Sequence, residues 1–89
     1  MSEARENRLK RLAMRSARRG TKEMDIILGR YAEAHLGAMS EPALDLYEAL
    51  LEENDQDLYQ WVTGQVAAPA GFAPLIELIA AHAGAAARG

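Results

Sequence analysis

The sequence predicts an all-α fold, a compact bundle of five short helices in a single domain over residues 1–89. Apolar residues recur at helical spacing in several segments, and no stretch alternates apolar and polar residues as a strand would. Caps and stop residues divide these segments into short pieces. A chain of 89 residues can bury one hydrophobic core but has no room for a second domain.

The first predicted helix begins near Ser2 and ends at a glycine. Arg18 and Arg19 precede Gly20, and basic residues followed by glycine are typical of a helix C-terminus. In that interpretation Gly20 adopts a positive φ. The predicted inner face consists of Leu9, Leu12, Ala13 and Ser16.

The second predicted helix begins at Thr21, whose hydroxyl can accept a hydrogen bond from the first turn. Glu23 and Asp25 lie in that turn, where carboxylates stabilise the positive end of the helix dipole. The predicted inner face consists of Met24, Ile27, Leu28 and Tyr31.

The third and fourth helices are marked by caps. Ser40, followed two residues later by Pro42, predicts a helix that extends to about Glu53. Asn54 or Asp55 then caps a short helix that ends at glycine. The predicted inner faces consist of Leu44, Tyr47, Leu50 and Leu51 in the third helix and Leu58, Trp61 and Val62 in the fourth.

The fifth helix is predicted to begin near Pro74, after a loop rich in alanine, proline and glycine. Residues 81–89 are expected to form a flexible tail. The predicted inner face consists of Leu75, Ile76, Leu78, Ile79 and His82.

The composition limits where the protein can work. The chain has no cysteine, which excludes disulfides and thiolate metal sites and favours a reducing compartment. No apolar run reaches the roughly 18 residues of a membrane-spanning helix, and the N-terminal segment is charged where a secretory signal would be apolar. We therefore expect a cytoplasmic protein without membrane insertion.

Charge is distributed very unevenly along the chain. Residues 1–30 carry nine basic and four acidic side chains, whereas residues 31–87 carry nine acidic side chains and no basic one. This pattern predicts a large dipole that could orient a charged partner.

Signatures of catalysis and of metal binding are sparse. His35 and His82 lack neighbours at metal-ligand spacing, so we expect a surface His35 and a core-edge His82 without a metal. No glycine-rich phosphate loop appears. The acidic residues Glu48, Glu52, Glu53, Asp55 and Asp57 lack the spacing of a calcium loop and are expected to be solvated. We therefore expect no enzymatic activity and no stably bound cofactor.

The basic first helix leaves a nucleic-acid hypothesis open. Eight basic residues lie within 18 positions: Arg5, Arg8, Lys10, Arg11, Arg15, Arg18, Arg19 and Lys22. The rest of the chain would repel phosphate, however, and no aromatic side chain lies among these residues. A regulatory or nucleic-acid-binding module is therefore an alternative, and a protein partner is preferred.

The segment ARRGTKEMD, residues 17–25, supports two interpretations. A helix end followed by an acidic first turn explains Arg18, Arg19, Gly20 and Glu23 without any partner. Alternatively, opposite charges fixed on an exposed corner remain available to another protein, because arginine can bind a carboxylate through two parallel hydrogen bonds.

At this segment the sequence resembles the FAD assembly factors of succinate dehydrogenase. Their RGxxE motif is present as Arg19-Gly20-Thr21-Lys22-Glu23. The similarity continues in RLKRLAMRSARRGTKEMDIILGRYAE, in SEPALDLYEALLEENDQDLYQWVTG and in PLIELI, and covers about residues 5–80.

The resemblance implies a five-helix protein that binds the flavoprotein subunit of succinate dehydrogenase, and that of fumarate reductase, and promotes covalent attachment of FAD. It implies that Arg19, Gly20 and Glu23 form the functional motif and that Asp25, Asp57, Tyr59 and Trp61 occupy family-like positions. Together with the corner, it predicts a partner-binding site of Arg18, Arg19, Gly20, Glu23, Asp25 and Asp57. We expect Trp61 to belong to the core and the free protein to be a monomer. A protein that carries FAD and delivers it is the main alternative.

Overall fold

Five α-helices make up the part of the chain that the structure describes, as the spacing of its apolar residues predicts. The computed structural model describes residues 3–88, with side chains through residue 84, and contains no strand within that range. The helices are α1 (Arg5–Ala17), α2 (Lys22–His35), α3 (Glu41–Leu51), α4 (Asp55–Val62) and α5 (Ala73–Arg88), and a short 3-10 helix, η1 (Leu36–Ala38), follows α2.

Three helices begin at the predicted caps. The side-chain oxygens of Thr21, Ser40 and Asn54 accept hydrogen bonds from backbone N–H groups in the first turns of α2, α3 and α4, at 3.3, 3.2 and 2.8 Å. Gly64, with φ of 81°, follows α4 as predicted. The start of α1 differs, because the helix begins at Arg5 after Ala4, which makes no side-chain cap. Ser2 lies outside the described residues.

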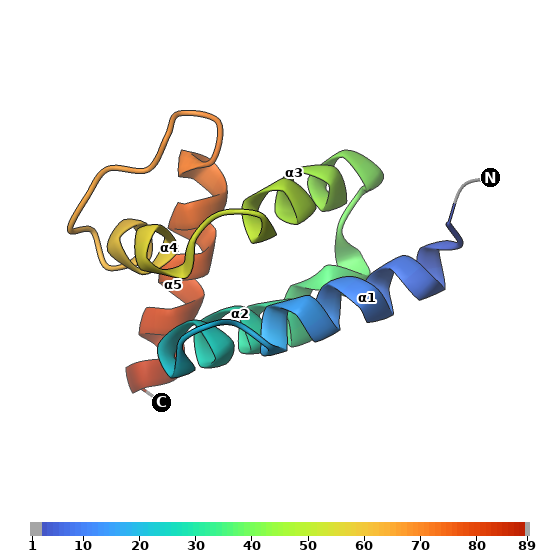
Figure 1. Cartoon of the computed structure of the whole chain (residues 1–89), viewed down its shortest axis with the longest axis horizontal. Coiled ribbons are helices and arrows are strands. Elements are labelled where there is room, and N and C mark those ends of the chain that lie inside the picture. The colour runs from blue at the N-terminus through green and yellow to red at the C-terminus, as the bar shows by residue number, and fades with distance from the viewer. Residues whose placement is uncertain (1–2, 89) are drawn as a thin grey trace.

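The helices pack as two groups. α1 and α2 run antiparallel along one side of the molecule, and α3 runs alongside α1 in the same direction, with Glu41 opposite Arg5 and Glu52 opposite Arg15 (Figure 1). α4 packs near the start of α2, beside the α1–α2 connection, and α5 crosses α2 steeply, with His82 in contact with Tyr31 and His35 near the end of α2. The Cα radius of gyration is 12.5 Å, close to the roughly 12 Å expected for a compact domain of this length.

Most predicted inner-face residues form the core, and two do not. The buried apolar side chains are Leu12, Met24, Leu28, Tyr31, Ala32, Leu36, Leu44, Tyr47, Leu50, Leu51, Leu58, Leu75, Ile76 and Ile79. Ala13 is exposed and Leu78 is 59% exposed. Each lies about 100° round its helix from a buried neighbour, Leu12 or Ile79, so both fall at the edge of the buried stripe.

A polar contact lies inside this core. Ser16 is fully buried, donates a hydrogen bond to the carbonyl of Leu12 at 2.7 Å, and lies 2.6 Å from the Tyr47 hydroxyl. Burial raises the pKa of Tyr47 to about 12. The small Ser16 therefore closes the inner stripe of α1, as predicted, and links α1 to α3.

The C-terminal part combines expected and unexpected features. Trp61 is half-buried against the core and its ring stacks on Phe72 at a centroid distance of 6.2 Å, as expected for a core residue. α5 continues to Arg88, so it includes most of the segment expected to be a tail, and the mobility of that segment stays a prediction. None of the helices described has the length and apolar character needed to span a membrane.

Candidate functional site

The α1–α2 corner is a four-residue connection, residues 18–21, that follows an unexpected backbone path. α1 ends at Ala17, Arg18 has φ of −128° and ψ of 67°, and α2 begins after Thr21. The prediction that Gly20 ends α1 with a positive φ is wrong, since Gly64 alone has a positive φ among the described residues. Another feature must therefore explain the glycine.

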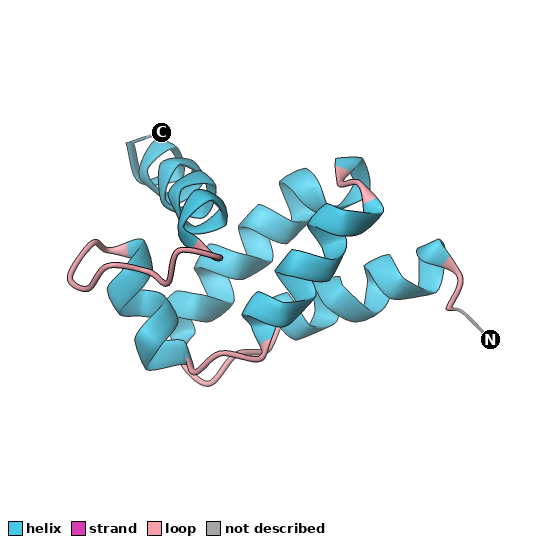
Figure 2. Cartoon of the chain, turned by 90° about the horizontal axis from the view of Figure 1, so that it is seen from above, coloured by secondary structure: helices cyan, strands magenta, loops and turns pink. Residues whose placement is uncertain are grey.

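Arg19 connects the corner to the α3–α4 junction. Its Nε donates to Asp55 Oδ1 at 2.7 Å, and its two terminal nitrogens donate to the carbonyls of Leu51 and Glu53 at 2.9 and 3.0 Å. These carbonyls belong to the last residue of α3 and to the segment just after it, where no intrahelical donor remains and where a positive charge is favoured. The two connections therefore lie against each other, as Figure 2 shows.

Two carboxylates complete this arrangement, which we call the corner clamp. Asp55 accepts a hydrogen bond from the backbone N–H of Gly20 through its second oxygen, and Asp25 accepts one from the backbone N–H of Arg19. The backbone donors of the turn are thus satisfied by side chains from α2 and α4. The corner clamp consists of Arg19, Gly20, Asp25 and Asp55.

Gly20 is explained by the close approach of Asp55. A Cβ atom placed on Gly20 would lie 2.9 Å from Asp55 Oδ2, which is shorter than real Cβ contacts. Any larger residue would push away the carboxylate that also holds Arg19. The glycine is therefore required by space and not by its φ angle.

The corner clamp changes what the predicted site residues can do. The expectation that Arg19 keeps its guanidinium available to a partner is wrong, because all three nitrogens donate within the chain and the side chain is only 10% exposed. Asp25 is also engaged internally. Arg18, Glu23 and Asp57 are exposed, and a partner-binding role for them stays a prediction.

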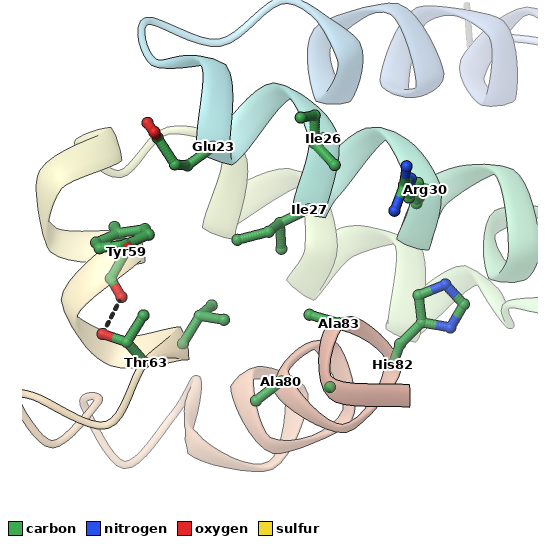
Figure 3. Close-up of a pocket in the computed structure, with 11 residues that line it drawn as sticks. Glu23, Ile26, Ile27, Arg30, Tyr59, Thr63, Ala80, His82 and Ala83 are labelled. Atoms are coloured by element: carbon green, nitrogen blue, oxygen red, sulfur yellow. Dashed lines mark hydrogen bonds between the residues drawn. The ribbon is translucent and has the colours of Figure 1, made fainter. Parts of the chain in front are cut away.

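Glu23 stands at the junction of two surface hollows. The larger has a volume of about 500 Å³ and lies between α2, α4 and α5 (Figure 3). The smaller, of about 280 Å³, extends from Glu23 past Tyr59 to Thr21 and Asp55. Glu23 makes no ion pair with another residue of the range 3–84, whose side chains the structure describes.

The larger hollow, here called the α2–α4–α5 groove, is not predicted from the sequence. Its walls are mainly apolar, and they include Ile26, Ile27, Tyr59, Val62 and Ala83. Ile26 is 42% exposed and Tyr59 is 38% exposed. In the sequence, the one indication of the groove is Ile26, a β-branched apolar residue just outside the predicted inner face of α2. Ile26 alone does not predict a groove, because the groove forms only where α2, α4 and α5 pack together.

The basic residues of α1 are largely neutralised by α3. Arg8 contacts Asp45 at 2.6 Å and Glu48 at 3.1 Å, and Arg11 contacts Glu48 at 2.8 Å. We call this surface the charged seam: Arg5, Arg8, Arg11 and Arg15 against Glu41, Asp45, Glu48 and Glu52.

The charged seam overturns two expectations. Hydrogen bonds from Arg11 hold the pKa of Glu48 below its usual value, so the ion pairs form within the protein. The expected large dipole is reduced because segments of opposite charge lie side by side. The acidic residues Glu48 and Glu52 are not simply solvated, and the arginines of the seam are not an open phosphate-binding surface.

The two histidines meet, although they are 47 positions apart. Their ring centroids lie 5.1 Å apart, and each ring also contacts Tyr31. His35 is exposed and His82 is half-buried, as predicted. Within the described residues, no three histidine or carboxylate side chains gather closely enough to hold a metal ion.

Comparison with known proteins identifies relatives of the chain. Residues 10–83 match the protein family described as flavinator of succinate dehydrogenase. The relatives include the mitochondrial succinate dehydrogenase assembly factor 2 of Meyerozyma guilliermondii, which is 44% identical over 61 residues, covering 68% of this chain and 45% of the relative. The protein of the same name from Mycosarcoma maydis is 38% identical over 72 residues, covering 81% of this chain and 30% of the relative.

A third relative has the same name and comes from Candida glabrata. It is 47% identical over 53 residues, covering 60% of this chain and 35% of the relative. This chain therefore matches less than half the length of each of these three relatives. Their names refer to the mitochondrion, which contradicts the expectation of a cytoplasmic location.

Proposed function

Because the chain belongs to the flavinator of succinate dehydrogenase family, we propose that it binds the flavoprotein subunit of succinate dehydrogenase and promotes covalent attachment of FAD to it. The flavoprotein of fumarate reductase is a second client in this proposal. The chain acts as an assembly factor and is not the catalyst of the flavin bond. It holds no FAD of its own.

The observation that supports the proposal is that the residues of the RGxxE motif have different surroundings: two are held within the chain and one is exposed. Arg19 and Gly20 belong to the corner clamp, which is tied to α2, α3 and α4. Glu23, the last residue of the motif, is exposed in the first turn of α2. The first two residues therefore fix the corner, and the third is presented to a partner.

A fixed corner suits a protein that stabilises one conformation of its client. A ligand shifts a conformational equilibrium only by its difference in affinity for the two states. A preorganised binding surface loses little conformational entropy on association. If the corner binds the flavin-competent arrangement about 3 kcal/mol more tightly, that state gains more than a hundredfold in relative population.

In this proposal Arg19 and Gly20 are positioning residues, and Glu23 and Arg18 contact the client. Glu23 offers a carboxylate to a basic group of the client, and Arg18 offers a guanidinium on the other side of the turn. Opposite charges at fixed positions set the register of docking more than they add affinity.

The test measures flavin attachment to a purified client. The apo-flavoprotein subunit is incubated with FAD, with and without this chain, and covalent flavin is followed by fluorescence of the denatured band in a gel. We expect the chain to accelerate attachment and Glu23→Gln to reduce that acceleration several-fold. Glu33→Gln is the matched control, since Glu33 is an exposed acid on the same helix and does not line the groove.

Each result has a consequence. No acceleration by the wild-type chain contradicts the proposed function. Acceleration that is equal for the wild type and for Glu23→Gln leaves the function standing but removes Glu23 from the contact surface. The unfolding midpoint of Glu23→Gln should stay close to that of the wild type, because the lost dipole interaction is worth only about 0.5 kcal/mol.

A further inference from the structure

The α2–α4–α5 groove has the form of a docking surface for one more helix. α2 supplies Glu23, Ile26, Ile27 and Arg30 to its wall, and α4 and α5 face them with Tyr59, Val62, Ala80 and Ala83 (Figure 3). Positions 23, 26, 27 and 30 are related as i, i+3, i+4 and i+7, so they form one stripe along two turns of α2. The stripe is about 10.5 Å long.

The two ends of this stripe have opposite charges. Glu23 lies at the end nearer Tyr59, and Arg30 lies at the end nearer His82 (Figure 3). Both side chains belong to exposed residues, and neither makes an ion pair with another residue of the part that the structure describes. A segment that fills the groove would therefore be basic at one end, apolar in the middle and acidic at the other end.

The groove continues into the corner. Glu23 and Tyr59 line both the groove and the smaller hollow, and that hollow reaches Thr21 and Asp55 beside Gly20. A partner that contacts the exposed residue of the RGxxE motif therefore lies at the mouth of the groove. This continuity, together with the charged ends, selects the client as the occupant.

Backbone hydrogen bonding decides the conformation of the occupant. The groove is walled by helices, whose backbone groups are bonded within themselves, so it offers no edge that could pair with an extended segment. An extended segment would leave its own N–H and C=O groups without partners in an apolar groove. A helix satisfies these groups internally and presents side chains at the spacing of the α2 stripe.

We propose that the α2–α4–α5 groove binds an amphipathic helix of the flavoprotein client that runs antiparallel to α2. This inference rests on the proposed function. Acidic residues are favoured at the N-terminus of a helix and basic residues at its C-terminus. A client helix with that polarity puts its acidic end beside Arg30 and its basic end beside Glu23 only if it runs antiparallel to α2.

The groove fits a polypeptide better than it fits FAD. A dinucleotide needs several donors directed at its diphosphate, usually from a glycine-rich loop or a helix N-terminus. Among the residues whose side chains the structure describes, the groove wall has one cation, Arg30, and the Glu23 carboxylate would repel the phosphates. Binding of FAD in this groove would therefore contradict the proposal.

The first experiment compares two exposed apolar residues. Ile26→Glu places a charge in the groove, whereas Leu78→Glu places one on α5 outside it, at a side chain that is 59% exposed. Titration of the apo-flavoprotein with each full-length variant should show about tenfold weaker binding for Ile26→Glu and no change for Leu78→Glu. Thermal unfolding checks that both variants remain folded.

The second experiment determines the direction of the client helix. A photo-crosslinking phenylalanine derivative replaces Tyr59 at one end of the groove or His82 at the other, and mass spectrometry identifies the client residues captured. We expect both sites to capture one helical segment, with the Tyr59 position reaching residues later in the client sequence than the His82 position.

Several results would overturn the proposal while leaving the function intact. If the wild-type chain accelerates flavin attachment but Ile26→Glu binds the client equally well, the groove is not used. Crosslinks to unrelated segments, crosslinks to a second copy of this chain only, or reversed order along the client helix would each contradict it. So would micromolar binding of FAD alone that is lost in Ile26→Glu.

Discussion

The charged seam and the corner clamp both connect α1 or its end to the later helices, but the ion pairs of the seam are more exposed to solvent than the ion pair of the clamp. In the seam, four arginines face four carboxylates at the surface, and the side chains of Asp45 and Glu52 are each 71% exposed. In the clamp, one arginine and one aspartate are 10% and 13% exposed and share their remaining hydrogen-bonding groups with the backbone. The comparison teaches that the number of ion pairs is a poor guide to their energetic importance.

Solvent exposure explains the difference. An exposed ion pair replaces hydrogen bonds to water with hydrogen bonds between its partners, in a medium of high dielectric constant. Each exposed pair therefore contributes little to the free energy of unfolding. A nearly buried pair cannot recruit water when one partner is removed, and the other charge is left unsatisfied. The clamp therefore supports the fold at a single point, whereas the seam spreads small contributions along α1.

Removing the arginine of the clamp should have the largest effect. We expect Arg19→Ala to lower the free energy of unfolding by about 3 kcal/mol, because Asp55 and the carbonyls of Leu51 and Glu53 lose their donor. Chemical denaturation in urea measures the change. Arg18→Ala is the control and should cost less than about 0.5 kcal/mol; equal losses for the two variants would contradict the importance of the clamp.

Adding one methyl group to the clamp should have an intermediate effect. Gly20→Ala should cost about 1–2 kcal/mol, because the new Cβ displaces the Asp55 carboxylate from its hydrogen bonds. In an Asp55→Ala background the same substitution should cost almost nothing. An undiminished cost in that background would mean that the backbone conformation of Gly20, and not the space beside it, is the constraint.

Breaking one pair of the seam should have a small effect. Arg11→Ala should lower the free energy of unfolding by about 0.5 kcal/mol, and the loss should shrink further when salt is added. Urea denaturation at two salt concentrations measures both quantities. A loss as large as that of Arg19→Ala would contradict the claim that the exposed pairs of the seam contribute less to stability than the clamp.

Acidification should weaken the ion pairs of the charged seam and so lower the free energy of unfolding. Hydrogen bonds from Arg11 lower the pKa of Glu48 in the folded protein, so the folded state holds the ionised form more strongly than the unfolded state does. Its contribution is therefore present above the unfolded pKa of about 4.3 and is lost as the pH falls through the folded value. Unfolding measured between pH 7 and pH 3 should show a smaller decline for Glu48→Gln, and an identical decline would contradict this assignment.

Local chemistry made much of the fold predictable. Thr21, Ser40 and Asn54 each bond a backbone group two or three residues away, and Gly64 acts within its own turn. Such signals are complete within a few residues, so they can be recognised without knowing how the helices pack. The RGxxE motif was found in the same way, as a short pattern.

The site was less predictable, because its contacts cross long stretches of chain. Asp55 was interpreted as a candidate cap of α4 and as a solvated acid, whereas it also binds Arg19, 36 positions earlier. Nothing in the spacing of the arginines distinguished Arg19, which is held by its own chain, from Arg18, which is exposed. The groove likewise needs α2, α4 and α5 together.

The amino-acid sequence alone determined the helices, most of their caps and the family resemblance, because these depend on residues within one or two turns of each other. Tertiary packing decided which charges neutralise one another, why position 20 is glycine, and where Glu23 opens onto a groove. The physical reason is range: a cap or an apolar stripe is local, but whether a charge is satisfied depends on the helix that packs against it.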